Sequence, residues 1–534
     1  MTPEDALTKA RVLVRVGLLE PMRPDRLVRS AIALRRWGPT IAGGFVADAA
    51  RYPDRVAVVD ERRTLTFDEL HRRSNALAHG LRDAAIGQGT VVGVLCRNHC
   101  GFVEATAALA KLGATSLQLN TGFAAPQLRD VIAREQPAAI VFDEEFGRVV
   151  QEAAPDLPGF VGWHDEPVTG PTLDRLIATG DRSDPPPPTR PGRTIVLTSG
   201  TTGTPRGAAR AQTSGINPLV ALCSAIPLRT RETTVIAAPL FHSWGFGHLA
   251  LGLLLGSTIV LHRRFDAAAT LDAVARHRAS VLVAVPVMLQ RMLDLPEPQR
   301  RAFDLSALRV VTVSGSSLPG KLATRFMDAF GDIVYNLYGS TEVAYATVAT
   351  PADLRVTPGT AGRPLPGVTI AILDEADRPV PDEGRGRIFV GNEMVIESYT
   401  DGGSKAAVGG MTSIGDIGHF GVDGRLTVDG RDDDMIVSGG ENVFPEEVER
   451  LLADHPAVVE VAVVGVPDRE FGQRLRAVVV RRPDASLTAA DVRSYVRANL
   501  ARHKVPRDVE FTDALPRNAT GKVVRRGAGP GPGW

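Results

Sequence analysis

The sequence predicts an α/β fold with largely parallel sheets in a large N-terminal domain, followed by a small C-terminal domain. Short apolar runs alternate with amphipathic helical segments through most of the chain, a pattern typical of strands joined by crossover helices. A capping box, Thr66 with Glu69, opens one such helix, which we expect to reach Ala84. The expected buried strands are residues 91–95, 139–142, 194–197, 235–240, 257–261, 281–285 and 310–313.

Four segments follow from changes in composition along the 534 residues. Residues 1–40 form a basic, amphipathic arm, and residues 41–432 form the large domain. Residues 433–526 form the small domain, which contains a Pro445-initiated helix, a strand at 458–466 and a helix at 487–501. Residues 527–534 are rich in glycine and proline, so we expect a disordered tail.

The overall composition indicates a soluble globular protein without a nucleic-acid footprint. Hydrophobic residues make up 44% and charged residues 23%, and 61 basic residues balance 61 acidic ones. Cys96 and Cys100 flank His99 without the second ligand pair that a zinc site needs. We therefore expect a reduced, cytoplasmic protein with no structural metal.

The arm allows two interpretations. Its arginines are interspersed with leucine, valine and isoleucine, and prolines interrupt it at Pro21 and Pro24. A helical extension packed on the main body is one interpretation, and contact with the inner face of a membrane is the other. A homodimer is compatible with either.

A loop rich in glycine and hydroxyl groups follows the expected strand at 194–197. Glycines allow sharp turns that present backbone N–H groups to phosphate oxygens, while hydroxyls and one cation add donors. The loop lacks the second glycine of a Walker A motif, because Pro205 stands five residues after Gly200. Its candidate phosphate-binding residues are Thr198, Ser199, Gly200, Thr201, Thr202, Gly203 and Arg206.

This loop resembles the signature of the adenylate-forming superfamily, which includes acyl-CoA synthetases, adenylation domains of peptide synthetases and firefly luciferase. Five further motifs occur in the family's order: residues 239–242 (PLFH), 338–342 (YGSTE), 415–416 (GD), 430–434 (GRDDD) and 516–522 (PRNATGK). The resemblance implies an acyl-CoA synthetase/luciferase-like fold whose small C-terminal domain moves as a lid. It also implies that ATP and coenzyme A are co-substrates and that Mg²⁺ is the cofactor.

The resemblance further implies a nucleotide site. Tyr338 stacks on adenine, with Gly315 and Ser316 closing the other side, and a phenol ring suits such a flat partner. Asp416 offers acceptors to the ribose diol, and Arg431 reaches ribose or phosphate oxygens. Gly339, in the same motif as Tyr338, and Gly439 and Gly440, in the small domain, complete the implied cofactor-binding set.

The implied catalytic residues are Lys522, His242, Glu342 and Thr341. Thr341 donates to the α-phosphate, and Glu342 with Thr198 holds Mg²⁺, a hard ion that prefers oxygen ligands. Lys522 neutralises charge as the carboxylate attacks the α-phosphate. Only six of the 61 basic residues are lysines, so a lysine in this motif is notable.

Two positions depart from the family pattern. Arg206 stands where the phosphate loop usually has lysine, and its planar guanidinium is not an equivalent point charge. Ile414 replaces the usual threonine before Gly415 and Asp416. The first departure leaves the role of Arg206 open.

The acid is expected to be apolar. His242 stands where amino-acid-activating relatives carry aspartate, and a histidine provides no permanent negative charge for an ammonium group. Residues 243–256, with Trp244, Phe246 and a leucine-rich continuation, would line an apolar acid pocket, although an ordinary buried helix is equally compatible with them. Residues 438–445 resemble bacterial medium- and long-chain fatty-acyl-CoA synthetases. We therefore expect a fatty acid, with an aromatic acid as the alternative.

Three functions remain open: a CoA ligase, an adenylating enzyme that loads a carrier protein in trans, and a silent nucleotide-binding protein. Intact Lys522, Glu342 and Asp416 argue against the silent protein. The CoA ligase is favoured, with two half-reactions that use two poses of the small domain. The implied pivot is Asp433, in an acidic turn between structured regions.

Overall fold

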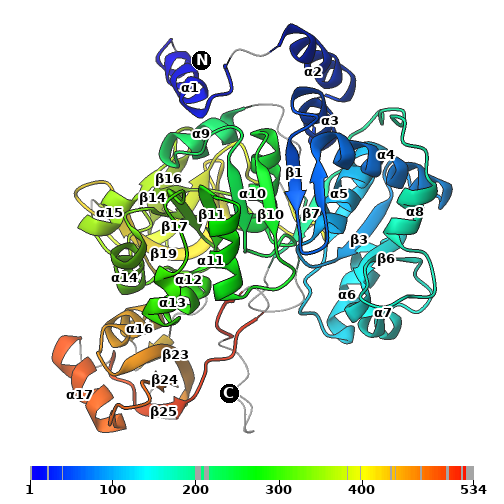
Figure 1. Cartoon of the computed structure of the whole chain (residues 1–534). Helices are drawn as coiled ribbons and strands as arrows, with labels where there is room; N and C mark the ends of the chain where they lie inside the picture. Colours follow the sequence, from blue (N-terminus) through cyan, green and yellow to red (C-terminus); the bar gives the residue numbers. More distant parts are fainter. Residues whose placement is uncertain are drawn as a thin grey trace.

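The computed structural model confirms the α/β class and consists of four sheets with helices packed around them (Figure 1). It describes residues 3–20, 23–38, 40–198, 206–209, 216–381, 383–396, 398–432, 436–438, 441–468, 472–500, 504–518 and 521–524. Among these, no helix is both long and apolar enough to cross a bilayer. The predictions for Ser199 to Gly203, Asp433, Gly439 and Gly440 and for residues 527–534 concern positions outside the described residues.

The arm consists of two helices, α1 (Pro3–Val16) and α2 (Pro24–Trp37), followed by α3 (Ile41–Arg51). α1 packs on α9 (Asn217–Ala225), where Arg15 donates to the backbone carbonyls of Cys223 and Ser224. α2 packs on α3 and buries Trp37. The arm is thus a helical extension packed on the body, as one of the two interpretations expects.

The first large sheet has the strand order β6-β5-β3-β4-β7-β8, and only its edge strand β8 is antiparallel. Its strands are β3 (Val91–Leu95), β4 (Thr115–Gln118), β5 (Ala139–Asp143), β6 (Gly159–Trp163), β7 (Thr194–Leu197) and β8 (Gly207–Ala209). Its helices are α4 (Phe67–Asp83), α5 (Cys100–Leu112), α6 (Ala125–Glu135), α7 (Gly147–Ala153) and α8 (Leu173–Thr179). The capping box of Thr66 and Glu69 is present at the start of α4, as expected.

The second large sheet has nine strands in the order β15-β14-β13-β12-β11-β9-β10-β1-β2. The strands from β13 to β1 are parallel, and both edges are antiparallel. Its strands are β1 (Val56–Val59), β2 (Thr64–Thr66), β9 (Thr233–Ile236), β10 (Thr258–Leu261), β11 (Val281–Ala284), β12 (Val310–Val313), β13 (Val334–Tyr338), β14 (Thr347–Ala349) and β15 (Arg363–Pro364). Its helices are α10 (Ser243–Leu254), α11 (Ala267–Arg276), α12 (Pro286–Leu293), α13 (Glu297–Arg301), α14 (Gly320–Phe330) and α15 (Pro351–Val356).

Parallel strands place the candidate residues at one edge of the sheets, because their carboxyl ends lie together. β7 ends just before Thr198, β12 just before Ser314, and β13 at Tyr338. The expected strand at 235–240 is shorter than predicted: β9 ends at Ile236, and the chain turns at Pro239 into α10. That turn carries His242 to the same edge.

Two smaller sheets complete the chain. β16 (Thr369–Leu373), β17 (Gly386–Gly391), β18 (Ala407–Val408), β19 (Met411–Phe420) and β20 (Leu426–Arg431) form one sheet. β21 (Ile436–Ser438), β22 (Glu441–Val443), β23 (Val458–Asp468), β24 (Gly472–Arg481) and β25 (Asp508–Thr512) form the other, with α16 (Pro445–Ala453) and α17 (Ala489–Asn499). This last unit has its own apolar core and extends from the body, in orange and red in Figure 1.

Candidate active site

Three of the residues expected to bind adenine and ribose, Tyr338, Asp416 and Arg431, form one hydrogen-bonded cluster. Asp416 on β19 lies opposite Arg431 on β20 in the antiparallel register. The Tyr338 hydroxyl donates to Asp416 Oδ2 at 2.6 Å, and Arg431 Nη1 donates to Oδ1 at 3.2 Å. Burial raises the pKa of Asp416, while the Arg431 charge acts in the opposite direction. The cluster fixes a buried carboxyl group between two donors beside the end of β13.

Glu342 provides a buried carboxylate one short turn after β13. Its side chain is 7% exposed, and Oε1 accepts from the Tyr399 hydroxyl and lies 3.8 Å from Lys405 Nζ. Burial alone would raise its pKa, but Lys405 and the hydroxyl donors outweigh burial and hold the pKa below the ordinary value. An ionised, buried carboxylate fits a hard divalent cation such as Mg²⁺.

Lys522 reaches the site from the small domain on a tight turn. An isolated bridge joins Arg517 to Val523, the Lys522 amide donates to Asn518 Oδ1 at 2.9 Å, and Gly521 has φ +80°. Burial, followed by the Arg431 charge, lowers the pKa of Lys522, whereas the charges of Asp416 and Glu342 raise it. The lysine is therefore a partly desolvated cation near two carboxyl groups.

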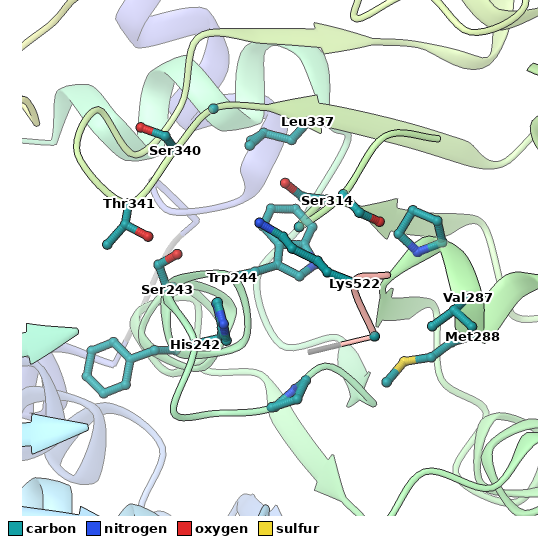
Figure 2. Close-up of a pocket in the computed structure, with 18 of the residues that line it drawn as sticks. His242, Ser243, Trp244, Val287, Met288, Ser314, Leu337, Ser340, Thr341 and Lys522 are labelled. Carbon is teal, nitrogen blue, oxygen red and sulfur yellow. The ribbon is translucent and has the colours of Figure 1, made fainter. Parts of the chain in front are cut away.

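His242 precedes the first residue of α10 and lies close enough to Lys522 to sense its charge. Burial and that charge lower the pKa of His242 to about 3, so the imidazole is neutral at physiological pH. Figure 2 shows Lys522 pointing in among His242, Ser243, Trp244 and Ser314. A neutral imidazole is unsuited to bind an ammonium group, which agrees with the expectation from sequence.

Trp244 forms a fixed wall of the pocket. Its Nε1 donates to the Ala284 carbonyl at 3.0 Å, and its ring contacts His248 edge-on with centroids 4.1 Å apart. Val287, Met288 and Leu337 line the pocket around it (Figure 2). The wall is apolar, flat and held by a hydrogen bond to the sheet.

The remaining described candidates line the same cavity, which has a volume of about 2590 Å³. They are Thr198, Arg206, Gly315, Ser316, Gly339 and Thr341. Gly315 has φ +92°, which suits glycine. The Thr198 amide donates to the Arg206 carbonyl at 2.8 Å, so the two ends of the phosphate loop are joined as neighbours.

The arrangement includes two residues that sequence reasoning did not assign, Tyr399 and Lys405. Both contact Glu342, and both come from the loop that precedes β18. The scarcity of lysine was a usable signal for Lys405, since it applies to every lysine in the chain. Tyr399 has no comparable signal, because its role depends on a hydrogen bond across 57 positions.

A second buried cluster consists of Cys96, His99 and Asp143. The candidate ligand atoms lie within 4.8 Å of one another. Nε2 of His99 lies 2.7 Å from Asp143 Oδ1, and Nδ1 accepts from the Gly101 amide. Both ring nitrogens of His99 therefore have hydrogen-bond partners within the protein, and the contact with Asp143 links the segment after β3 to the end of β5.

Two family models match the chain. Residues 45–400 match the AMP-binding enzyme model, and residues 447–522 match the AMP-binding enzyme C-terminal domain. Among curated proteins, an indoleacetate–CoA ligase of Aromatoleum aromaticum is 33% identical, over 88% of this chain and 94% of that protein. A feruloyl-CoA synthase of an Amycolatopsis species is 32% identical, over 90% and 96%.

Other relatives are named for a different acid or for a different acceptor of the acyl group. A fatty acid–[acyl-carrier-protein] ligase of Streptomyces coeruleorubidus is 30% identical, over 90% of this chain and 93% of that protein. The o-succinylbenzoate CoA synthetase of Bacillus subtilis, solved with its acyl-adenylate, superposes with a TM-score of 0.79 at 28% identity, over 90% and 96%. The chain therefore belongs to the AMP-binding enzyme family, and it is an AMP-forming acid–thiol ligase that uses ATP, Mg²⁺ and coenzyme A.

Proposed function

We propose that the protein is a CoA ligase for an aryl or other ring-bearing carboxylic acid. In the first half-reaction, a carboxylate oxygen attacks the α-phosphorus of ATP, giving the acyl-adenylate and releasing pyrophosphate. In the second, the thiol of coenzyme A attacks the acyl carbon, giving the thioester and releasing AMP. The observation that carries the proposal is Lys522 of the small domain pointing into a pocket whose wall is Trp244 (Figure 2).

The shape of the pocket supports an acid with a planar ring. The Trp244 indole cannot turn without losing its hydrogen bond to Ala284, so the pocket offers a flat face for stacking. Val287 and Met288 add apolar contacts nearby. The relatives named for indoleacetate and ferulate also favour this class over the fatty acid that the sequence alone suggested.

The side chains supply the chemistry of the first step by position and charge. Lys522 is placed to neutralise charge on the attacking carboxylate and the α-phosphate, and its desolvation strengthens that interaction. Glu342, with Thr198, would hold Mg²⁺, which neutralises phosphate charge when bound. Tyr338, Asp416 and Arg431 would hold the nucleoside so that the phosphates reach Lys522.

An acid panel tests the proposal. The purified protein is incubated with MgATP and either benzoate, ferulate, indoleacetate, octanoate or palmitate, with and without coenzyme A. We expect AMP release and thioester formation to be fastest with a ring-bearing acid and to require coenzyme A. A higher kcat/KM for octanoate or palmitate would overturn the aryl class.

A carrier protein is the second candidate acceptor. The Streptomyces relative is named as a ligase of a fatty acid and an acyl carrier protein, and the first half-reaction is the same for both acceptors. Acyl-adenylate formation with no thioester on coenzyme A, followed by transfer to a holo-carrier protein, would favour this alternative.

We further propose peripheral contact of α2 with an anionic lipid surface. Leu27, Val28 and Ile32 are exposed on this helix beside Arg29 and other arginines, a combination that suits an interface with anionic lipid. The triple variant Arg29→Gln, Arg35→Gln, Arg36→Gln keeps the buried face of α2. We expect it to sediment less than the native chain with phosphatidylglycerol vesicles at low salt. Equal sedimentation of both proteins would remove the proposal.

A further inference from the structure

The loop between Tyr399 and Lys405 lies against the phosphate end of the site. The Thr400 amide donates to the Gly207 carbonyl at 2.8 Å, and an isolated bridge joins Tyr399 to Ala208. The loop is thus attached to β8, immediately after the phosphate loop. Its first and last residues both contact Glu342.

The phosphate-loop cation, Arg206, is engaged by this same loop. Its Nε lies 3.2 Å from Asp401 Oδ2, and its guanidinium lies over the Tyr399 ring, 5.5 Å from the centroid. The Asp401 carboxylate offsets the arginine charge. Arg206 is therefore a poor replacement for the lysine that the phosphate loop usually carries.

Lys405 is the cation of this loop that lies beside Glu342. Its Nζ donates to the Ile414 carbonyl at 3.1 Å and lies 3.8 Å from Glu342 Oε1. Its charge also acts on the buried Asp416 carboxyl group. Lys405 thus lies between the ribose carboxyl and the metal carboxyl, where the phosphate chain of a nucleotide has to pass.

Gly415, which has no side chain, allows the charged groups of Arg431 and Lys405 to lie close to its backbone. The residue has φ +83°, and a Cβ there would lie 3.2 Å from Arg431 Nη2 and 3.5 Å from Lys405 Nζ. Both side chains therefore lie over the same backbone segment. Two converging cations at a nucleotide site are suited to the oxygens of a polyphosphate.

We propose that Lys405 is a further catalytic residue, which binds the phosphate chain of ATP and neutralises the departing pyrophosphate in place of the phosphate-loop lysine. A compact ammonium group with three donors serves this role as a point charge. On binding, Nζ exchanges its contact with Glu342 for phosphate oxygens, which leaves that carboxylate to the metal. The proposal rests on the ligase reaction but not on the class of acid.

Binding measurements without any acid test this role. The dissociation constant of MgATP is measured by calorimetry for the native protein and for Lys405→Met. The dissociation constant of adenosine is measured for the same two proteins by competition with MgATP. We expect the variant to bind MgATP at least tenfold more weakly and adenosine within twofold of the native value. The variant Lys405→Arg should keep most of the MgATP affinity. The variant Arg206→Met should lose less MgATP affinity than Lys405→Met.

Matched controls separate charge from structure. Arg276→Met removes one exposed positive charge on α11, far from these residues in sequence, and should leave both constants unchanged. Equal weakening of MgATP and adenosine by Lys405→Met would overturn the proposal, because the lysine would then only support Asp416. Full recovery of MgATP binding at high Mg²⁺ would also overturn it, because the lysine would then only position Glu342.

Discussion

We propose that the first half-reaction depends on Lys522. Its charge would act while the carboxylate attacks phosphorus, whereas the later attack of a thiol on the acyl carbon would not use it. We expect Lys522→Ala to lower the rate of acyl-adenylate formation by about 10²-fold or more, the scale of losing one preorganised electrostatic donor. Pyrophosphate release reports this step. Thioester formation from supplied acyl-adenylate is the control, and an equal loss there would contradict the role.

The buried Asp48 on α3 should make the free energy of unfolding depend on pH. The side chain is buried, and burial raises its pKa to about 8, only partly offset by the Arg51 charge. The folded state therefore holds a proton that the unfolded chain releases above pH 3.8. Hence the free energy of unfolding should fall as pH rises from about 4 to about 8, by at most about 1.4 kcal/mol per pH unit.

The variant Asp48→Asn removes this titration while keeping the shape of the side chain. We expect its advantage in unfolding free energy over the native chain to grow between pH 5 and pH 8, measured by urea denaturation. A constant difference across this range would show that Asp48 is ionised in the folded protein.

At the scale of the element, the turn that carries Lys522 depends on Gly521. Its φ of +80° disfavours other residues, and a Cβ there would lie 2.6 Å from Val287 Cγ1. Gly521→Ala should displace the turn from the pocket wall. A displacement of about 1 Å is enough to cost about 10²-fold in rate, so adenylation should fall while the melting temperature stays close to native.

Gly367→Ala is the matched control for this turn. Gly367 has φ +78°, similar to Gly521, but nothing lies within 4 Å of its Cβ position. It therefore imposes the same backbone strain without a clash. If both variants lose adenylation equally, backbone strain in general is responsible and not the contact with Val287.

At the scale of the whole molecule, the structure shows the small domain in the pose that presents Lys522. Arg450 of α16 donates to the Val428 carbonyl at 3.1 Å, and Lys321 of α14 donates to the Asp454 carbonyl at 3.2 Å. A thiol has to reach the same acyl carbon that Lys522 approaches. We propose that the small domain turns about Asp433 to admit it and to bring residues 438–443 to the thiol channel.

Proline at position 433 tests this movement, because it fixes φ near −65° and removes an N–H. We expect Asp433→Pro to retain acyl-adenylate formation, which is measured by isotope exchange with pyrophosphate. We expect it to lose thioester formation from isolated acyl-adenylate. Survival of both half-reactions would place the pivot elsewhere. Asp433→Ala is the control for loss of the carboxylate alone.

Sequence alone determined the fold class, the position of most strands and the family, because these depend on patterns within a few neighbouring residues. Apolar runs specify buried strands such as β12, a capping box starts α4, and motif order identifies the enzyme family. Only the tertiary structure decided which cation faces Glu342. Lys405 and Glu342 are far apart in the chain, and the packing of the loop beside β8 brings them together while it diverts Arg206 to Asp401. Our proposal of a ring-bearing acid likewise rests on the orientation of Trp244, which a hydrogen bond to strand β11 sets and no local sequence pattern records.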